Sequence, residues 1–158
     1  SLHEIGARIS PARLHKHGAY LVENAGLRGF SPDEVATIAS LVRFHRGKDP
    51  RSVYPPFAAL SAAEQESVVV LVGLLRLAHA VARGPEGERL EVGVASRRGA
   101  LRVLISGSEN PDAVIAEARL AADLLARTLE SRIEIGAGEV DRAKGRRAGV
   151  EALPLERR

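Results

Sequence analysis

The sequence predicts a mainly α protein, a helical bundle that is followed by a small α+β module. Apolar residues recur at steps of three and four from about residue 11 to residue 82, a period typical of amphipathic helices. From Leu90 they alternate with charged or small residues, a period typical of strands. We therefore expect a helical domain at 1–86, an α+β module at 87–137 and a disordered tail at 138–158.

The first expected helix opens at Pro11 and ends near Asn24 to Gly26. Its apolar face is expected to carry Leu14, His17, Leu21 and Ala25. The second helix begins with Ser31 as N-cap, Pro32 in the first turn and Glu34 completing a capping box. Its predicted core face consists of Val35, Ile38, Ala39, Val42 and His45.

Residues 47–56 contain several glycines and prolines and predict an exposed loop. Ser61 and Glu64 form a second capping box, and the apolar run from Val68 to Ala82 predicts a central helix that is buried on most sides. His79 lies in this run, which favours a role in the core.

The expected module starts with a hairpin, because alternating segments at 90–94 and 101–105 flank the turn Arg97-Arg98-Gly99. A single helix is expected from Asp112 to Glu130, with Val114, Ala118, Ala121, Leu125 and Leu129 on one stripe. Residues 132–135 predict a third strand.

The composition excludes several kinds of function. The chain has 158 residues and no cysteine, so disulfides, thiolate metal sites and a cysteine nucleophile are excluded. Aromatic residues make up 3%, which gives little support for stacking on bases. The net charge is +3, and arginine far outnumbers lysine, which favours an anionic partner bound through bidentate contacts.

Two further expectations concern context. No apolar run approaches the roughly 20 residues that cross a bilayer, so we expect a cytoplasmic protein without a membrane partner. The sequence has no methionine, even at position 1, so we expect that it is a domain excised from a longer chain.

Basic and histidine side chains cluster in the first third of the chain. Four of the five histidines, His3, His15, His17 and His45, lie within its first 45 residues. Charge-assisted hydrogen bonds from such side chains would hold successive phosphates of a polyanion in a basic groove. The groove is predicted to consist of His15, Lys16, His17, Arg43, His45, Arg46 and Lys48. The alternative is that His17 and His45 are buried packing residues and the cations are solvated.

Several segments in order resemble a known family. These are Leu2-His3-Glu4-Ile5-Gly6, the run His15 to Leu21, the Gly29-Phe30 turn and Arg43-Phe44-His45-Arg46. Together they resemble the C-terminal, HD-like helical region of the exopolyphosphatase/guanosine pentaphosphate phosphohydrolase (Ppx/GppA) family.

The resemblance implies a regulatory and substrate-binding part that binds polyphosphate or guanosine pentaphosphate and forms a homodimer. Catalysis would need Mg²⁺ and the N-terminal catalytic domain, which has an actin-like ATPase fold in the family and is missing here. The fragment alone is then expected to be inactive and to hold no cofactor.

Two alternatives remain open. The first is an autonomous HD-type phosphohydrolase that acts on a nucleotide, with His3, Glu4, His17 and His45 as metal ligands. Residues 74–83 contain no aspartate where the HD pattern has a further ligand, so we expect no metal. The second alternative is a dimerisation module in which the histidines are structural.

Overall fold

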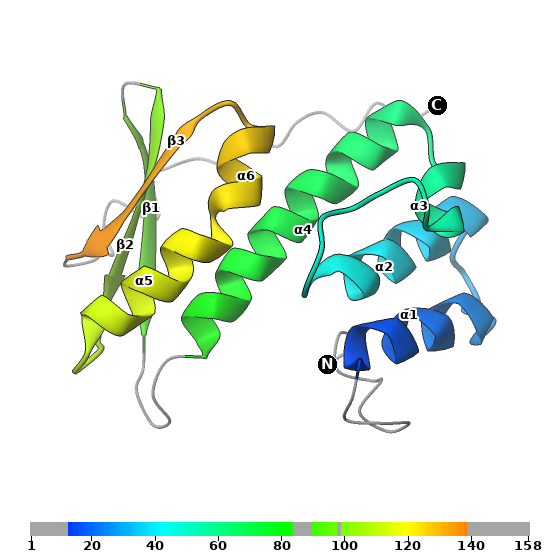
Figure 1. Cartoon of the computed structure of the whole chain (residues 1–158), viewed down its shortest axis with the longest axis horizontal. Helices are drawn as coiled ribbons and strands as arrows, with labels where there is room; N and C mark the ends of the chain where they lie inside the picture. Colours follow the sequence, from blue (N-terminus) through cyan, green and yellow to red (C-terminus); the bar gives the residue numbers. More distant parts are fainter. Residues whose placement is uncertain (1–12, 84–89, 98, 139–158) are drawn as a thin grey trace.

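The computed structural model describes residues 13–83, 90–97 and 99–138 (Figure 1). A helical part is followed by a module of two helices and three strands, which confirms the mainly α architecture with a small α+β module. The elements in chain order are α1 (Leu14–Asn24), α2 (Pro32–Phe44), α3 (Pro55–Ala59), α4 (Ala62–Ala82), β1 (Glu91–Arg97), β2 (Ala100–Ser106), α5 (Pro111–Ala121), α6 (Asp123–Thr128) and β3 (Arg132–Ala137).

The two predicted capping boxes are both present. The backbone N–H of Ser31 donates to Glu34 Oε2 at 2.7 Å, and the Glu34 N–H donates back to the Ser31 hydroxyl at 3.2 Å. Ser61 and Glu64 repeat this exchange at the start of α4. Each box satisfies two backbone donors that a helix N-terminus leaves open, which is why both helices begin where the sequence predicted.

Helix α1 packs on α2 by a face that the sequence did not predict. Its buried residues are Gly18, Ala19 and Val22, whereas Leu14, His17 and Leu21 are only half-buried and Ala25 is exposed. Ala19 and Ala39 of α2 lie in one cluster and are 1% and 0% exposed. Small residues let the two helix backbones approach closely, and this close contact outweighs the larger side chains.

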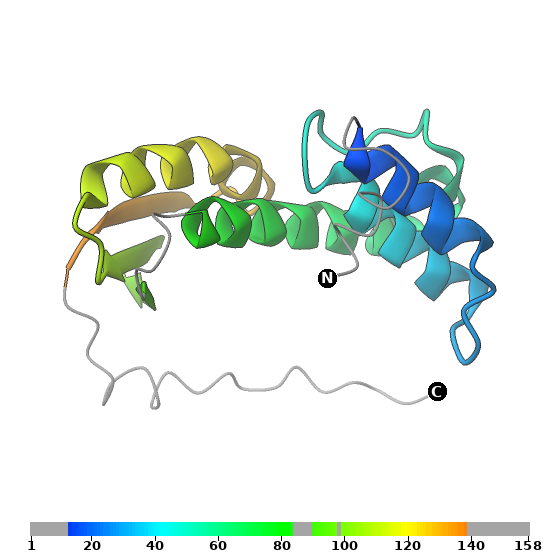
Figure 2. The ribbon, with the colours of Figure 1, turned by 90° about the horizontal axis from the view of Figure 1, so that it is seen from below.

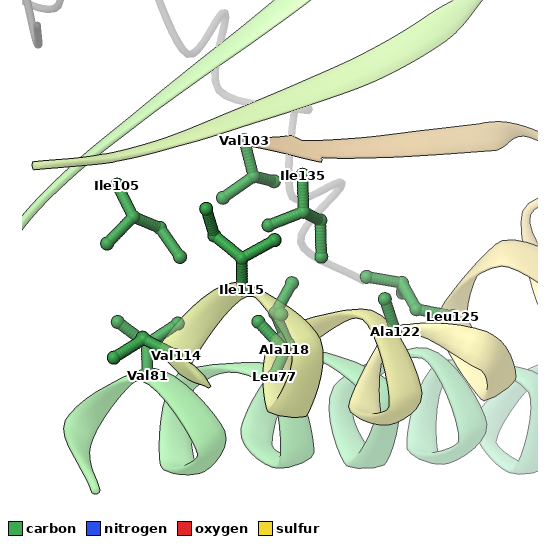
Figure 3. Close-up of a cluster of buried hydrophobic side chains, with 10 residues drawn as sticks. All are labelled: Leu77, Val81, Val103, Ile105, Val114, Ile115, Ala118, Ala122, Leu125 and Ile135. Carbon is green, nitrogen blue, oxygen red and sulfur yellow. The ribbon is translucent and has the colours of Figure 1, made fainter. Parts of the chain in front are cut away.

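Helix α4 belongs to both halves of the molecule. Its first half joins a core cluster with Phe44, Phe57 and Leu60, through Val68 and Val72. Its second half, through Leu77 and Val81, joins the cluster under the sheet (Figure 3). At Gly73 between them, an added Cβ would lie 3.0 Å from Leu125 Cβ and 3.1 Å from its Cα, so a larger residue would require the α6 backbone to move by a few tenths of an ångström. The predicted domain boundary at residues 86 and 87 therefore follows a helix that both cores share, and it stays a prediction.

Helix α4 is also long and apolar enough to cross a bilayer, with a mean hydropathy of 1.4 over an 18-residue window of which 22% is buried. The apolar run from Val68 to Ala82 predicted this helix but not a span, because polar residues interrupt the run. The expectation that the helix is buried on most sides was wrong, since Leu71 and Leu74 are 43% and 47% exposed. Length and composition alone are weak evidence for a span. The guanidinium of Arg76, in the second half of the helix, donates hydrogen bonds to protein groups outside it, and a bilayer core disfavours such a charge.

The sheet has the order β1-β2-β3. β1 and β2 form the predicted antiparallel hairpin, whereas β3 runs parallel to β2, so α5 and α6 make the crossover and cover one face of the sheet (Figure 2). The prediction of one helix from Asp112 to Glu130 was wrong. The helix starts at Pro111 and is interrupted at Ala122, and Leu129 follows its end and is 40% exposed.

Candidate functional site

A pocket of about 440 Å³ lies where α1, the end of α2 and the following loop meet. This volume is in the range of small-molecule sites, roughly 300 to 1,000 Å³. Three segments supply its walls, and their contributions are strongly basic. The lining residues are His15, Lys16, Arg43, Phe44, Arg46, Gly47, Lys48, Asp49, Arg51, Val53 and Tyr54.

The loop between α2 and α3 is held in place by Arg76 of α4. Its Nε and Nη2 donate to the Phe44 carbonyl at 3.1 and 2.9 Å, and Nη2 also donates to the carbonyls of Gly47 and Lys48 at 3.1 and 2.8 Å. Nη1 donates to Asp49 Oδ1 at 2.7 Å. One guanidinium therefore donates to a backbone carbonyl at the C-terminus of α2 and also holds the loop that carries Lys48 and Arg51. The predicted exposed loop is in fact partly buried, since Asp49, Pro50 and Tyr54 are half-buried.

Asp49 links the pocket to the α+β module. Its Oδ2 accepts a hydrogen bond from Arg127 of α6 at 3.0 Å, while Oδ1 accepts from Arg76. Partial burial alone would raise the pKa of Asp49, but the hydrogen bonds from Arg76 and Arg127 lower it below the ordinary value. The carboxylate is therefore ionised and bridges two guanidinium groups.

Aromatic rings orient Arg43. Its guanidinium carbon lies 5.6 Å from the centre of the Tyr54 ring and 5.9 Å from that of Phe44. The Tyr54 hydroxyl donates to Glu23 of α1, and burial together with this hydrogen bond raises the pKa of Tyr54. Tyr54 is thus a neutral donor that joins the loop to α1 and holds a flat surface beside Arg43.

The pKa of His15 depends on its burial and on the charged side chains around it. Burial lowers its pKa below the ordinary value, and the positive charges of Arg43 and Lys16 lower it further. Neighbouring cations disfavour a second positive charge, so this second part of the shift reflects a local excess of positive potential. Such a region favours an anion, which would in turn favour the charged form of the ring.

A family model described as Ppx/GppA phosphatase, domain III, matches residues 1–121. The chain belongs to the Ppx/GppA phosphatase family. A relative, the guanosine-5'-triphosphate,3'-diphosphate pyrophosphatase of Pseudoalteromonas translucida (strain TAC 125), is 35% identical over 77 residues. These residues are 49% of this chain and 15% of the relative, so the match spans a small part of that protein. The predicted family is confirmed.

In this Ppx/GppA domain, five of the seven predicted groove residues line the pocket together. They are His15, Lys16, Arg43, Arg46 and Lys48. Arg51, Asp49 and Tyr54 were not predicted as site residues, although the two prolines after Tyr54 marked the loop. Arg76 was missed as well, and its one sequence signal was a lone arginine within an apolar helix.

The other two predicted groove residues do not line the pocket. His45 is 3% exposed, and its Nδ1 donates to the Val42 carbonyl at 2.8 Å, so it packs within the helical core. His17 is half-buried on α1. The spacing of His45 also predicted an inward position on the apolar face of the second helix. The structure has His45 in this buried position, at the C-terminal cap of α2, and outside the pocket lining. His79 accepts a hydrogen bond from Arg46 at 2.7 Å through Nε2 and so joins α4 to the pocket wall.

Among residues 13–83, 90–97 and 99–138, no group of three or more His, Cys, Asp or Glu side chains is arranged to hold a metal ion. Two predicted ligands of the HD-type alternative, His3 and Glu4, lie outside the described residues. His45, a third, uses Nδ1 in the helix cap. The described part of the pocket thus offers hydrogen-bond donors and positive charge in place of a metal-ligand set.

Proposed function

We propose that this chain is the regulatory and substrate-binding part of an exopolyphosphatase-like enzyme and binds polyphosphate, or a related polyanion such as guanosine pentaphosphate, in the basic pocket. The observation that carries the proposal is that several cationic side chains line one pocket. The one carboxylate in the lining, Asp49, already accepts hydrogen bonds from two other arginines, Arg76 and Arg127. The cations are Lys16, Arg43, Arg46, Lys48 and Arg51.

The pocket chemistry matches a chain of phosphates better than a single small anion. Arginine presents a rigid fork of donors that fits phosphate oxygens, and lysine adds a compact point charge. The cations come from α1, from the end of α2 and from the loop, so they surround the pocket. An anion with repeated charges can contact several of them at once.

The remaining parts of the proposal rest on the family resemblance and, for the location, on the sequence. The HD-like character of the helical part belongs here, as do homodimer formation and a cytoplasmic location without a membrane partner. Hydrolysis would be carried out by a catalytic region outside this sequence, and Mg²⁺ would act there. This domain would hold the polyanion and supply no catalytic group.

Calorimetric titration with long-chain polyphosphate in the presence of chelator tests the proposal. We expect binding that weakens as salt concentration rises, because each neutralised phosphate releases condensed counterions. The titration is repeated with Mn²⁺. Absence of binding in chelator, followed by phosphate release once Mn²⁺ is added, would instead support the HD-type hydrolase.

Binding is expected to depend on pH through His15. Its pKa is lowered in the free protein, and a bound phosphate favours the protonated ring, so binding takes up a proton. Affinity for long-chain polyphosphate should therefore rise as pH falls from the pKa of the ring in the complex towards its lowered pKa in the free protein, by up to about tenfold for each unit by which the anion raises the pKa. Titrations in two buffers with different ionisation enthalpies measure the proton uptake. His15→Gln should lose it and His17→Gln should keep most of it; equal uptake in wild type and His15→Gln would contradict the assignment.

A further inference from the structure

Asp49 lines the pocket and accepts hydrogen bonds from arginine side chains, as a bound anion would. Its two oxygens accept from two different arginines, Oδ1 from Arg76 at 2.7 Å and Oδ2 from Arg127 at 3.0 Å. Carboxylate and phosphate groups satisfy guanidinium donors with the same geometry. Asp49 therefore occupies donors that a phosphate could use, from within the chain itself.

The two arginines differ in how firmly they are committed. The Arg76 side chain is 15% exposed and also bonds three backbone carbonyls, so it is part of the loop structure. The Arg127 side chain is 58% exposed. Its other partner is Asp123, whose side chain is 67% exposed and whose Oδ2 lies 2.9 Å from Arg127 Nη2. Exposed ion pairs of this kind contribute little to stability. Arg127 can thus exchange a carboxylate for a phosphate without loss of the fold.

Resting on the proposed function, we propose that Arg127 is a further phosphate contact and that Asp49 is an internal competitor which occupies it in the empty pocket. A long polyphosphate leaves the pocket past Asp49 and binds Arg127 on α6. Tripolyphosphate is confined to the pocket and does not use this contact. The affinity therefore depends on the chain length of the anion through Arg127, an arginine of the α+β module beyond the segment 1–121 that the family model matches.

The test compares long-chain polyphosphate with tripolyphosphate in calorimetric titrations of the full chain. Arg127→Ala should weaken long-chain binding by about tenfold, the effect of one charge-assisted hydrogen bond, and change tripolyphosphate binding by less than about twofold. Arg102→Ala is the matched control, because Arg102 is also exposed and also pairs with a carboxylate, Glu134 of the sheet. Equal effects of Arg127→Ala and Arg102→Ala on the long chain would overturn the contact.

Asp49→Asn tests the competition. It keeps the shape of the side chain but removes the negative charge from the pocket wall, so long-chain affinity should rise several-fold. Asp123→Asn removes a carboxylate from the same arginine outside the pocket lining and should raise affinity less. If Asp49 served the loop structure alone, Asp49→Asn would weaken binding, and that result would overturn the competitor role.

These outcomes separate the inference from the proposed function. If wild type does not bind long-chain polyphosphate, both are overturned. If wild type binds and loses binding in Lys16→Ala with Arg46→Ala, while Arg127→Ala behaves like Arg102→Ala, only the inference fails. Thermal unfolding of each variant checks the fold, and the Arg127→Ala comparison stands even if Asp49→Asn is unstable.

Discussion

Replacing Arg76 with methionine is expected to lower the free energy of unfolding by about 3 kcal/mol, because it leaves Oδ1 of the half-buried Asp49 and three backbone carbonyls without their donor. Methionine keeps an unbranched side chain with high helix propensity, so α4 itself should persist. Urea unfolding followed by circular dichroism measures the change. Polyphosphate binding should weaken in parallel, since the loop that carries Lys48 and Arg51 loses its support.

Two variants give this prediction its controls. Arg83→Met makes the same chemical change at an exposed position just after α4 and should alter stability by less than about 0.5 kcal/mol. Arg76→Lys keeps the charge but replaces the planar fork with a single ammonium, so its stability should fall between wild type and Arg76→Met. If Arg76→Met were as stable as Arg83→Met, the loop would not depend on the guanidinium.

The parts of the fold that local sequence determines were predicted well. Both capping boxes, the hairpin and the third strand depend on residues that are close in sequence, and each was found. The helix faces were harder to predict. The core face of α1 follows the small residues Gly18 and Ala19, because the closeness of α2 outweighs side-chain size, and nothing within α1 alone reveals its partner.

The candidate site divides in the same way. The cations near His15 and Arg46 stand out as clusters in sequence, and the structure brings five of the predicted residues to one pocket. Arg76 and Arg127 lie 27 and 78 positions from Asp49, so no spacing rule connects them to the loop. His45 satisfied two patterns at once, a basic cluster and an apolar helix face. The apolar face prevailed because the inward position of His45 at the C-terminal cap of α2 buries the ring.

The combined substitution Lys16→Ala with Arg46→Ala is expected to weaken long-chain polyphosphate binding by about 100-fold or more, since each removed charge-assisted hydrogen bond is worth about 1.5 to 3 kcal/mol. Lys16 on α1 and Arg46 after α2 come from different elements, so their joint removal takes positive charge from two sides of the pocket. Calorimetric titration at low and moderate salt measures both the affinity and its salt dependence. The slope of log affinity against log salt should become shallower, because fewer counterions are released.

A matched double variant, Arg102→Ala with Arg132→Ala, removes the same net charge from the sheet, where both arginines pair with Glu134. A uniformly basic surface would lose affinity equally in both double variants. If polyphosphate binds in the pocket, affinity falls only when Lys16 and Arg46 are removed. Thermal unfolding checks that the domain stays folded without the hydrogen bond from Arg46 to His79. Unchanged affinity in Lys16→Ala with Arg46→Ala would exclude this pocket as the polyanion site, whatever the behaviour of the rest of the surface.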